Sequence, residues 1–327
     1  MMMAWGKKGR KTMRTDVLSV VLTASMLVGG PVACAHQSEA GSSVAVPRAQ
    51  AAQTQPEYDT AEDVLAALED ADEGLRTFTS GIIYTTITDL GGALKRRTGE
   101  IAFAQEPSED GPTSRRFAVS FDTYLVGERY FEDERALQTI AFDGRFLTEM
   151  LHSEQQINKR EIVAQGQDVD PFELGDGPFP PLPIGQQKDD ILRRYDVRLV
   201  PATESLEPSE DLDRDDPFDL PEIRIAEGLM RFADGSVQLL LVPRRASADT
   251  KFSEIRLWYK ADDSGRLLPR MSRTVDANSR DVSIVQLMHP LKINDAPRED
   301  LLTIEAPAGW TVNETRLTTP TTGRERP

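Results

Sequence analysis

The residue types that most often carry catalysis or bind metals are sparse in this chain of 327 residues, which has three histidines and one cysteine. His36 lies in a polar N-terminal stretch, and neither His152 nor His289 has a second histidine or a cysteine at the spacing of a metal site. We expect both to be surface or hydrogen-bonded histidines. The signatures of serine hydrolases, phosphate loops and dinucleotide-binding folds are also missing. The sequence therefore predicts no catalytic centre, metal or cofactor, with an enzyme of unfamiliar site as an alternative.

One acidic run has the spacing of calcium ligands. Asp211, Asp213 and Asp215 alternate, and Glu222 is the twelfth residue counted from Asp211, as in an EF-hand loop. The sixth position holds Asp216, where the loop needs a glycine for its sharp turn, and two prolines interrupt the rest. We therefore favour a solvated acidic loop over a calcium site.

The single cysteine, Cys34, follows a segment typical of an export signal. Residues 1–35 hold five basic side chains, one acid and an apolar run over 17–28 that is too short to span a membrane. Cys34 lies at the expected cleavage point, where a lipobox-like ending and an ordinary small-residue ending compete. We expect Cys34 to be lipidated and to anchor the protein to a membrane. Plain secretion is the alternative.

Charge excludes one class of partner. The formal net charge is -16, and the basic surplus of residues 1–35 leaves about -20 on the rest of the chain. A body of that sign has no broad attraction for phosphate backbones or anionic membrane surfaces, so nucleic acid is not an expected partner. Residues 36–57 are rich in Ala, Gln, Ser and Pro and lack hydrophobic periodicity, which predicts a flexible tether.

The hydrophobic pattern of the remaining body, which we expect to be a single domain over 58–313, predicts an α+β fold. Apolar residues recur at helical spacing over 60–75 and 186–195. The pair Asp143-Gly144 predicts a two-residue hairpin turn with positive φ angles at both residues. Polar segments near 166–183 and 204–222 are expected to be insertions, and 314–327 a disordered tail. Period-two alternation and turn signals predict strands from Phe78 on, over 117–121, 137–142, 145–152, 157–164, 196–201, 236–242, 253–260, 267–275, 282–288 and 302–312.

One face of the predicted sheet is continuously apolar. In the strand over 253–260, Arg256 and Lys260 lie on the opposite face, with Trp258 between them, and we expect that face to meet water. The helix over 60–75 is expected to bury Leu65 and Leu68 against the apolar face. Either loops and side chains fill this interior, or part of it stays open to acyl chains. The candidate ligand-binding residues of wall and lid are Leu65, Leu68, Val119, Phe121, Leu239, Leu241, Ile255, Leu257 and Tyr259.

The body from about 61 to 312 resembles the family of the outer-membrane lipoprotein carrier and receptor, LolA and LolB. The resemblance is carried by the opening helix, the strand meander from Phe78 and the order of the late segments Val237–Pro243, Ile255–Tyr259, Leu268-Pro269, Val282–Met288 and Ala306–Trp310. It implies a large curved antiparallel sheet forming an incomplete β-barrel, with a few helices as a lid and a hydrophobic cavity for acyl chains. The chain departs from the short carriers in its two polar insertions and in Cys34.

The resemblance also implies a function and a location. The protein is expected to be a non-catalytic cell-envelope protein that binds lipid or lipoprotein acyl chains, with outer-membrane lipoprotein sorting as its role. Its body would lie on the periplasmic side, anchored to the outer membrane through Cys34. The alternative is an envelope interaction or sensor protein that uses the same fold to recognise a protein partner.

Overall fold

The computed structural model describes residues 57–89, 93–106, 114–127, 129–164, 184, 187–208, 210, 212–215, 220–244 and 251–317. All of them belong to one compact unit, residues 52–327. The predicted export signal with Cys34, His36, nearly all of the tether, the insertion over 166–183 and Asp211 lie outside the described residues. Within the described part of the chain, no helix has the length and apolar character needed to cross a membrane.

The described residues form four α-helices, a short 3-10 helix and fourteen strands. The helices are α1 (Ala61–Asp72), α2 (Lys188–Arg194), α3 (Leu220–Ala233) and α4 (Glu299–Leu302), and the 3-10 helix is His152–Glu154. The strands are β1 (Thr77–Ile87), β2 (Leu94–Glu106), β3 (Ser114–Val126), β4 (Arg129–Phe131), β5 (Gln138–Phe142), β6 (Phe146–Leu151), β7 (Gln156–Glu161), β8 (Tyr195–Val200), β9 (Val237–Pro243), β10 (Phe252–Ala261), β11 (Leu267–Asp276), β12 (Val282–Leu287), β13 (Lys292–Ile293) and β14 (Thr311–Thr315).

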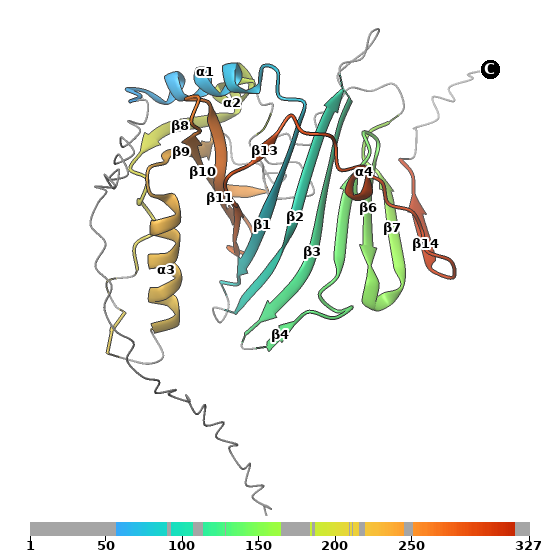
Figure 1. Cartoon of the computed structure of the whole chain (residues 1–327). Coiled ribbons are helices and arrows are strands. Elements are labelled where there is room, and N and C mark those ends of the chain that lie inside the picture. The colour runs from blue at the N-terminus through green and yellow to red at the C-terminus, as the bar shows by residue number, and fades with distance from the viewer. Residues whose placement is uncertain are drawn as a thin grey trace, which may run out of the picture. The chain divides into compact units, whose positions relative to one another are not determined.

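All fourteen strands belong to one sheet (Figure 1). Its order is β14-β7-β6-β5-β3-β2-β1-β12-β11-β10-β9-β8, with β13 beside β1 and β4 beside β3. The pairings are antiparallel except that of β14 with β7, which is parallel. Because β8 and β14 are the two edges, the sheet is not closed into a barrel. The predicted α+β class with one large curved sheet is confirmed.

Helix α1 starts where the sequence predicts it. The Thr60 hydroxyl accepts a hydrogen bond from the Asp63 backbone N–H at 3.2 Å, and the Asp63 carboxylate accepts one from the Thr60 N–H at 3.0 Å. This reciprocal capping box gives hydrogen-bond partners to two backbone N–H groups that have none within the helix, because no helical turn precedes them. Val64 and Leu65 then fall on the buried side of the helix. The cap and the apolar spacing together fix which side of α1 meets the sheet.

The predicted hairpin between β5 and β6 is present, with different turn geometry. The Asp143 N–H donates to the Phe146 carbonyl at 3.2 Å, so the central turn residues are Gly144 and Arg145. Gly144 alone among these has a positive φ, of 98°. Asp143 acts through its carboxylate, which accepts from the Arg145 and Phe146 N–H groups at 2.9 and 2.7 Å. The prediction of a positive φ at Asp143 was therefore wrong, because the side chain stabilises the turn instead.

Two segments differ from the predicted elements. Helix α3, of 14 residues, begins inside the segment near 204–222 that was expected to be a polar insertion. The strand predicted over 302–312 is wrong, because this segment contains the end of α4, an irregular connection and the start of β14. Strand β14 runs to Thr315, two residues past the expected domain end at 313, and pairs with the edge strand β7. The helix and the late strand both depend on contacts with distant parts of the chain.

The sheet has two faces, each with two apolar clusters. Face A carries cluster 1, on β1–β3, β5, β6 and β12, and cluster 2, on β8–β11 under helices α1 and α2. Face B carries cluster 3, where α4 packs on alanines of β2, β3 and β5, and cluster 4, where α3 packs on β10–β12. The core therefore lies on both sides of the sheet, and the long β10 is buried on both faces.

Candidate functional site

One row of register partners joins the two clusters of face A. Leu239 of β9 pairs with Leu257 of β10, Leu257 with Ser272 of β11, and Ser272 with Val285 of β12. Residues that lie opposite one another on neighbouring strands point to the same face of a sheet. Leu239 and Leu257 belong to cluster 2, whereas Val285 belongs to cluster 1. The two apolar clusters therefore meet at β11.

The strand where they meet is polar on this face. Ser272 and Thr274 are 2% and 1% exposed, and neither side-chain oxygen has a hydrogen-bond partner among the described residues. Thr274 pairs with Ile255 of β10, one step along face A from Ser272 and Leu257. A buried hydroxyl left without a partner costs about 1–3 kcal/mol. We call these two hydroxyls the polar seam, and both are able to donate to or accept from a bound molecule.

The predicted wall and lid residues fall into two places on face A. Cluster 2 contains Leu65, Leu239, Leu241, Ile255, Leu257 and Tyr259, and Leu68 packs against it. Cluster 1 contains Val119 and Phe121 on β3. Strands β2, β1, β12 and β11 separate β3 from β10 in the sheet. The structure thus brings seven of the nine residues together under α1 and places the other two further along the same face.

Cluster 1 is built on a row of aromatic rings. Phe78, Phe103, Phe117 and Phe142 are successive register partners on β1, β2, β3 and β5. The ring centroids of Phe78 and Phe103 are 5.5 Å apart, and those of Phe117 and Phe142 are 6.0 Å apart. Such ring pairs contribute about 0.5–1.5 kcal/mol beyond the burial of their area. They make this part of face A a rigid apolar surface.

Helices α1 and α2 cover cluster 2 as a pair (Figure 1). Val64 and Leu65 of α1 and Ile191 of α2 are buried in it. The Lys188 N–H at the start of α2 donates to the Glu69 carboxylate of α1 at 2.7 Å, so the two helices are tied to each other as well as to the sheet. Burial of Tyr259 beneath them raises the pKa of its phenol well above its ordinary value. Tyr259 is therefore neutral at physiological pH, as an apolar interior requires.

A half-buried cation on face A was not predicted from the sequence. Arg97 of β2 pairs with Tyr84, and its guanidinium carbon is 4.2 Å from the centre of the Tyr124 ring. Its Nη1 donates to the Ala136 carbonyl at 3.0 Å, and burial lowers the pKa of this arginine. A guanidinium over an aromatic ring keeps donors free in the plane of the group. Arg97 thus adds a hydrogen-bonding cation beside the rings of cluster 1.

The polar seam was also missed, although the sequence carries a signal for it. In β11, Ser272 and Thr274 alternate with Met271 and Arg273, which places both hydroxyls on one face of the strand. Nothing in that pattern says which face is buried. The missing knowledge is the register with β10 and β12, which sets Leu257 and Val285 on the two sides of Ser272. The same register sets Ile255 and Ser283 on the two sides of Thr274.

The opposite face of β10 does not meet water, contrary to expectation. Arg256 is buried and pairs with Glu254 at 2.8 Å and with Glu204 at 3.1 Å. Trp258 is fully buried in cluster 4, and its indole N–H donates to the Ala202 carbonyl at 2.7 Å. The expectation failed because α3 and the turn over 201–206 cover this face. Lys260 reaches the Asp234 carbonyl at 3.0 Å in an exposed setting.

The two described histidines have structural surroundings. The His289 ring nitrogen Nε2 is 3.3 Å from the Pro269 carbonyl, and burial lowers the pKa of this imidazole. His152 lies edge-on to the Trp310 ring, with ring centroids 5.2 Å apart. Among the described residues, no three histidine, cysteine, aspartate or glutamate side chains lie together as metal ligands would. Their positions match the expectation of hydrogen-bonded or surface histidines.

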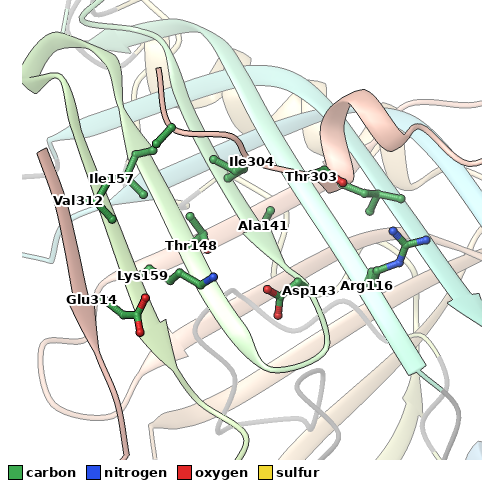
Figure 2. Close-up of a pocket in the computed structure, with 12 residues that line it drawn as sticks. Arg116, Ala141, Asp143, Thr148, Ile157, Lys159, Thr303, Ile304, Val312 and Glu314 are labelled. Carbon is green, nitrogen blue, oxygen red and sulfur yellow. The ribbon is translucent and has the colours of Figure 1, made fainter. Parts of the chain in front are cut away.

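A pocket of about 460 Å³ lies on face B near the β14 edge of the sheet (Figure 2). Ala141, Thr148 and Ile157 belong to its sheet side, and the connection from α4 to β14 passes over them. Its charged lining is mixed, with basic Arg116 and Lys159 and acidic residues from two elements. Arg116 is already paired with Glu299 at 2.9 Å and with Glu106 at 2.7 Å. This pocket therefore has no dominant charge with which to select a ligand.

Among known proteins, similarity to this chain is found only at the level of solved structures, and LolA-like structures are among them. No protein-family model and no curated protein sequence matches it. Among solved structures it is similar to a LolA superfamily protein from Nitrosomonas europaea, with 13% identity, a TM-score of 0.28, and coverage of 75% of this chain and 98% of the other. A domain from Vibrio parahaemolyticus, described as outer membrane lipoprotein-sorting, has 9% identity, a TM-score of 0.33, and coverage of 73% and 94%.

A third similar structure is the MucA/MucB complex of Pseudomonas aeruginosa, with 18% identity, a TM-score of 0.33, and coverage of 75% of this chain and 61% of the other. The solved structures similar to this chain thus include members of the LolA superfamily, which the sequence also resembles. At these identities and TM-scores the likeness carries no argument about function. The features of this chain that bear on function are the apolar face A and the polar seam.

Proposed function

We propose that the protein is a non-catalytic cell-envelope protein that binds lipid or lipoprotein acyl chains on face A. The acyl chain would lie along clusters 1 and 2, between the sheet and the helices α1 and α2. The apolar character of face A across both clusters supports this proposal. Each methylene moved from water into such surroundings gains about 0.8 kcal/mol, so one long acyl chain supplies a large driving force.

The polar seam is the observation that carries the proposal furthest. An interior built only for packing gains nothing from two buried hydroxyls without partners, because each costs free energy. A lipid carries ester or amide carbonyls next to its acyl chains, and these accept hydrogen bonds. With acyl chains on Leu257 and Val285 to either side, the hydroxyls of Ser272 and Thr274 would donate to such a carbonyl. The seam would then fix where the chains begin.

Entry of an acyl chain requires α1 to move, because Val64 and Leu65 occupy the surface of cluster 2. The helix is amphipathic and its last turn contains no basic residue that would favour the helix end. In the proposed mechanism α1 and α2 lift together, since the Lys188–Glu69 hydrogen bond ties them. The acyl chain replaces their apolar side chains over the sheet, so the exchange leaves the buried apolar area nearly unchanged.

The proposed location follows from the N-terminal sequence. An export signal ending at Cys34 supports a periplasmic body, and acylation of Cys34 would hold it at the outer membrane. Stable anchoring takes more than one acyl chain, as a lipidated N-terminal cysteine provides. Outer-membrane lipoprotein sorting is the role proposed for this arrangement.

Native mass spectrometry of the full chain tests the function. The Cys34→Ser variant removes the expected anchor, so any lipid that remains bound to it must occupy the folded body. We expect co-purified phospholipid or lipopeptide at about one molecule per chain. A lipid-free variant that carries a stoichiometric protein partner would instead support the alternative, an envelope interaction or sensor protein. The anchor itself is tested by the mass of the wild-type N-terminus, which must include the acyl groups.

A further inference from the structure

A second pocket lies on face B, between α3 and the middle of the sheet. It has a volume of about 340 Å³ and is lined by residues of β1, β2, β12 and α3. Its floor is set by register: Thr85 of β1 pairs with Arg96 of β2 and with Ile284 of β12, and Ile83 pairs with Gln286. These five side chains are neighbours on one face of three adjoining strands. The pocket is separate from the acyl-binding face proposed above.

The lining of this pocket is basic, in a chain of net charge -16. Arg96 and Arg224 both line it, whereas no aspartate or glutamate does. The Arg96 Nε donates to the Thr85 hydroxyl at 3.4 Å, and in the part of the chain that the structure describes neither Arg96 nor Arg224 belongs to an ion pair. Nearby arginines on β10 and β11 are, by contrast, paired with Glu254. Two arginines without counter-charges at one pocket favour an anion.

A buried amide points to a ligand independently of charge. Gln286 lines the pocket and is only 8% exposed. It lies opposite Ile83 of β1 and Met271 of β11, so its amide has apolar neighbours on both sides. An oxygen-rich group bound in the pocket would accept a hydrogen bond from this amide.

Helix α3 leaves room for such a group. Gly228 lies in the middle of α3 and lines the pocket, and a Cβ added there would meet no atom within 4 Å. Glycine in a helix interior is less stabilising than alanine, so Gly228 does not contribute to the stability of α3. Ile225 and Leu229 flank Gly228 and, with Ile284 from the sheet, make the walls apolar. The pocket thus offers basic and amide donors next to an apolar wall.

We propose that this pocket binds the phosphate group of an amphiphilic phosphate ester. Arg96 and Arg224 would hold the phosphate oxygens, and the Gln286 amide would donate to one of them. The first carbons of the alkyl part would lie against Ile225 and Leu229. The same chemistry is offered by a phospholipid head group or by a soluble alkyl phosphate, whereas inorganic phosphate lacks the apolar part.

Isothermal titration calorimetry of the Cys34→Ser chain with decyl phosphate, inorganic phosphate and decanol tests the pocket. Decyl phosphate is expected to bind at least about tenfold more tightly than either of the others, since only it fills both parts of the site. Arg224→Gln and Gly228→Leu should each weaken decyl phosphate binding by about tenfold, the first by loss of charge and the second by filling the space. Arg231→Gln, an exposed arginine on the same helix outside the pocket, is the matched control.

The outcomes separate this site from the acyl site of face A. A neutral fluorescent acyl ester should bind the Arg224→Gln and Gly228→Leu chains as tightly as it binds the chain without these substitutions, because its site lies on the other face. Unchanged decyl phosphate affinity in Arg224→Gln, whose exposed position leaves folding intact, would overturn the proposal. Equal affinity for inorganic phosphate and decyl phosphate would overturn the amphiphilic part. Vesicles containing phosphatidic acid, compared with phosphatidylcholine vesicles, decide whether a membrane lipid can supply the head group.

Discussion

Leu257 on β10 and Ser272 on β11 lie directly opposite each other on face A, so a fully buried leucine adjoins a buried hydroxyl that has no hydrogen-bond partner among the described residues. On the other side of Ser272 lies Val285, also buried. A polar group between two apolar neighbours is costly in an interior made only for packing. A hydroxyl between two apolar side chains is instead what a binding site for an acyl chain requires, because the acyl chain ends in a carbonyl group.

The cost of the polar seam is measurable in the absence of ligand. We expect Thr274→Val to raise the free energy of unfolding by about 1 kcal/mol or more, because it removes an unpaired buried hydroxyl and keeps the shape of the side chain. Urea denaturation of the lipid-free chain measures this change. Thr139→Val on β5 is the control, since its hydroxyl lies 3.2 Å from that of Ser120 and its loss removes a hydrogen bond. A stability loss at Thr274 equal to that at Thr139 would contradict an unpaired hydroxyl.

Docking of α1 depends on Leu65 more than on Leu68. Leu65 is buried in cluster 2, whereas Leu68 is half-buried at its margin. We expect Leu65→Ala to lower the free energy of unfolding by about 2–5 kcal/mol, and Leu68→Ala by clearly less. Thermal denaturation of both variants compares them. Equal and small effects would mean that α1 is not packed against the sheet.

Trp258 is expected to hold the turn over 201–206 against face B. Trp258→Phe removes the indole N–H that donates to the carbonyl of half-buried Ala202 and so removes this hydrogen bond. The free energy of unfolding should fall by about 1–3 kcal/mol. Trp310→Phe, at a partly exposed ring beside His152, is the matched control and should cost less. A larger loss at Trp310 would contradict the role assigned to cluster 4.

His289 makes stability depend on pH in a mildly acidic range. Burial, and then Arg270, lowers the pKa of its imidazole below the ordinary value of 6.5, while Asp262 acts in the opposite direction. The unfolded chain therefore takes up this proton before the folded one, so stability is lost as pH falls below about 6.5. Carboxylates with lowered pKa, such as Asp276, contribute only at still lower pH, near and below about 4.

The His289→Gln variant isolates this contribution. Chemical denaturation of the wild type between pH 7 and pH 5 should show falling stability, and the glutamine variant should show a flatter profile over the same interval. The glutamine amide can still donate to the Pro269 carbonyl, so the variant keeps the contact and loses the titration. Parallel profiles for the two proteins would show that His289 is not the titrating group.

Much of the sheet was predictable because its signals are local. The capping box of Thr60 and Asp63 gave the start of α1, and Gly144 with Asp143 gave the β5–β6 turn. The apolar face of β10 followed from period-two alternation at Leu257 and Tyr259. These features depend on neighbours within four residues, which a single sequence displays.

Helix α3 and the polar seam needed information that is not local. The segment Leu220–Ala233 follows an acidic run and has Pro221 near its start, where a first helical turn tolerates proline. Its apolar residues gain a partner only when Trp258 and Ile284 lie beneath them. Similarly, Ser272 is unpaired only because of the strands placed on both sides of β11. The alternation of residues in β10 also does not predict that both of its faces are buried, one in cluster 2 and the other in cluster 4.

The central claim, that face A binds acyl chains with the polar seam at their carbonyl end, is tested most directly by binding of a fluorescent fatty-acyl ester to the Cys34→Ser chain. The account predicts micromolar binding, and a loss of about tenfold in affinity in the Ser272→Ala/Thr274→Val double variant, which lacks two hydrogen-bond donors but stays folded. The claim would be contradicted if the chain with Ser272 and Thr274 intact bound no ester at micromolar concentration. It would also be contradicted if the folded double variant bound the ester with equal affinity.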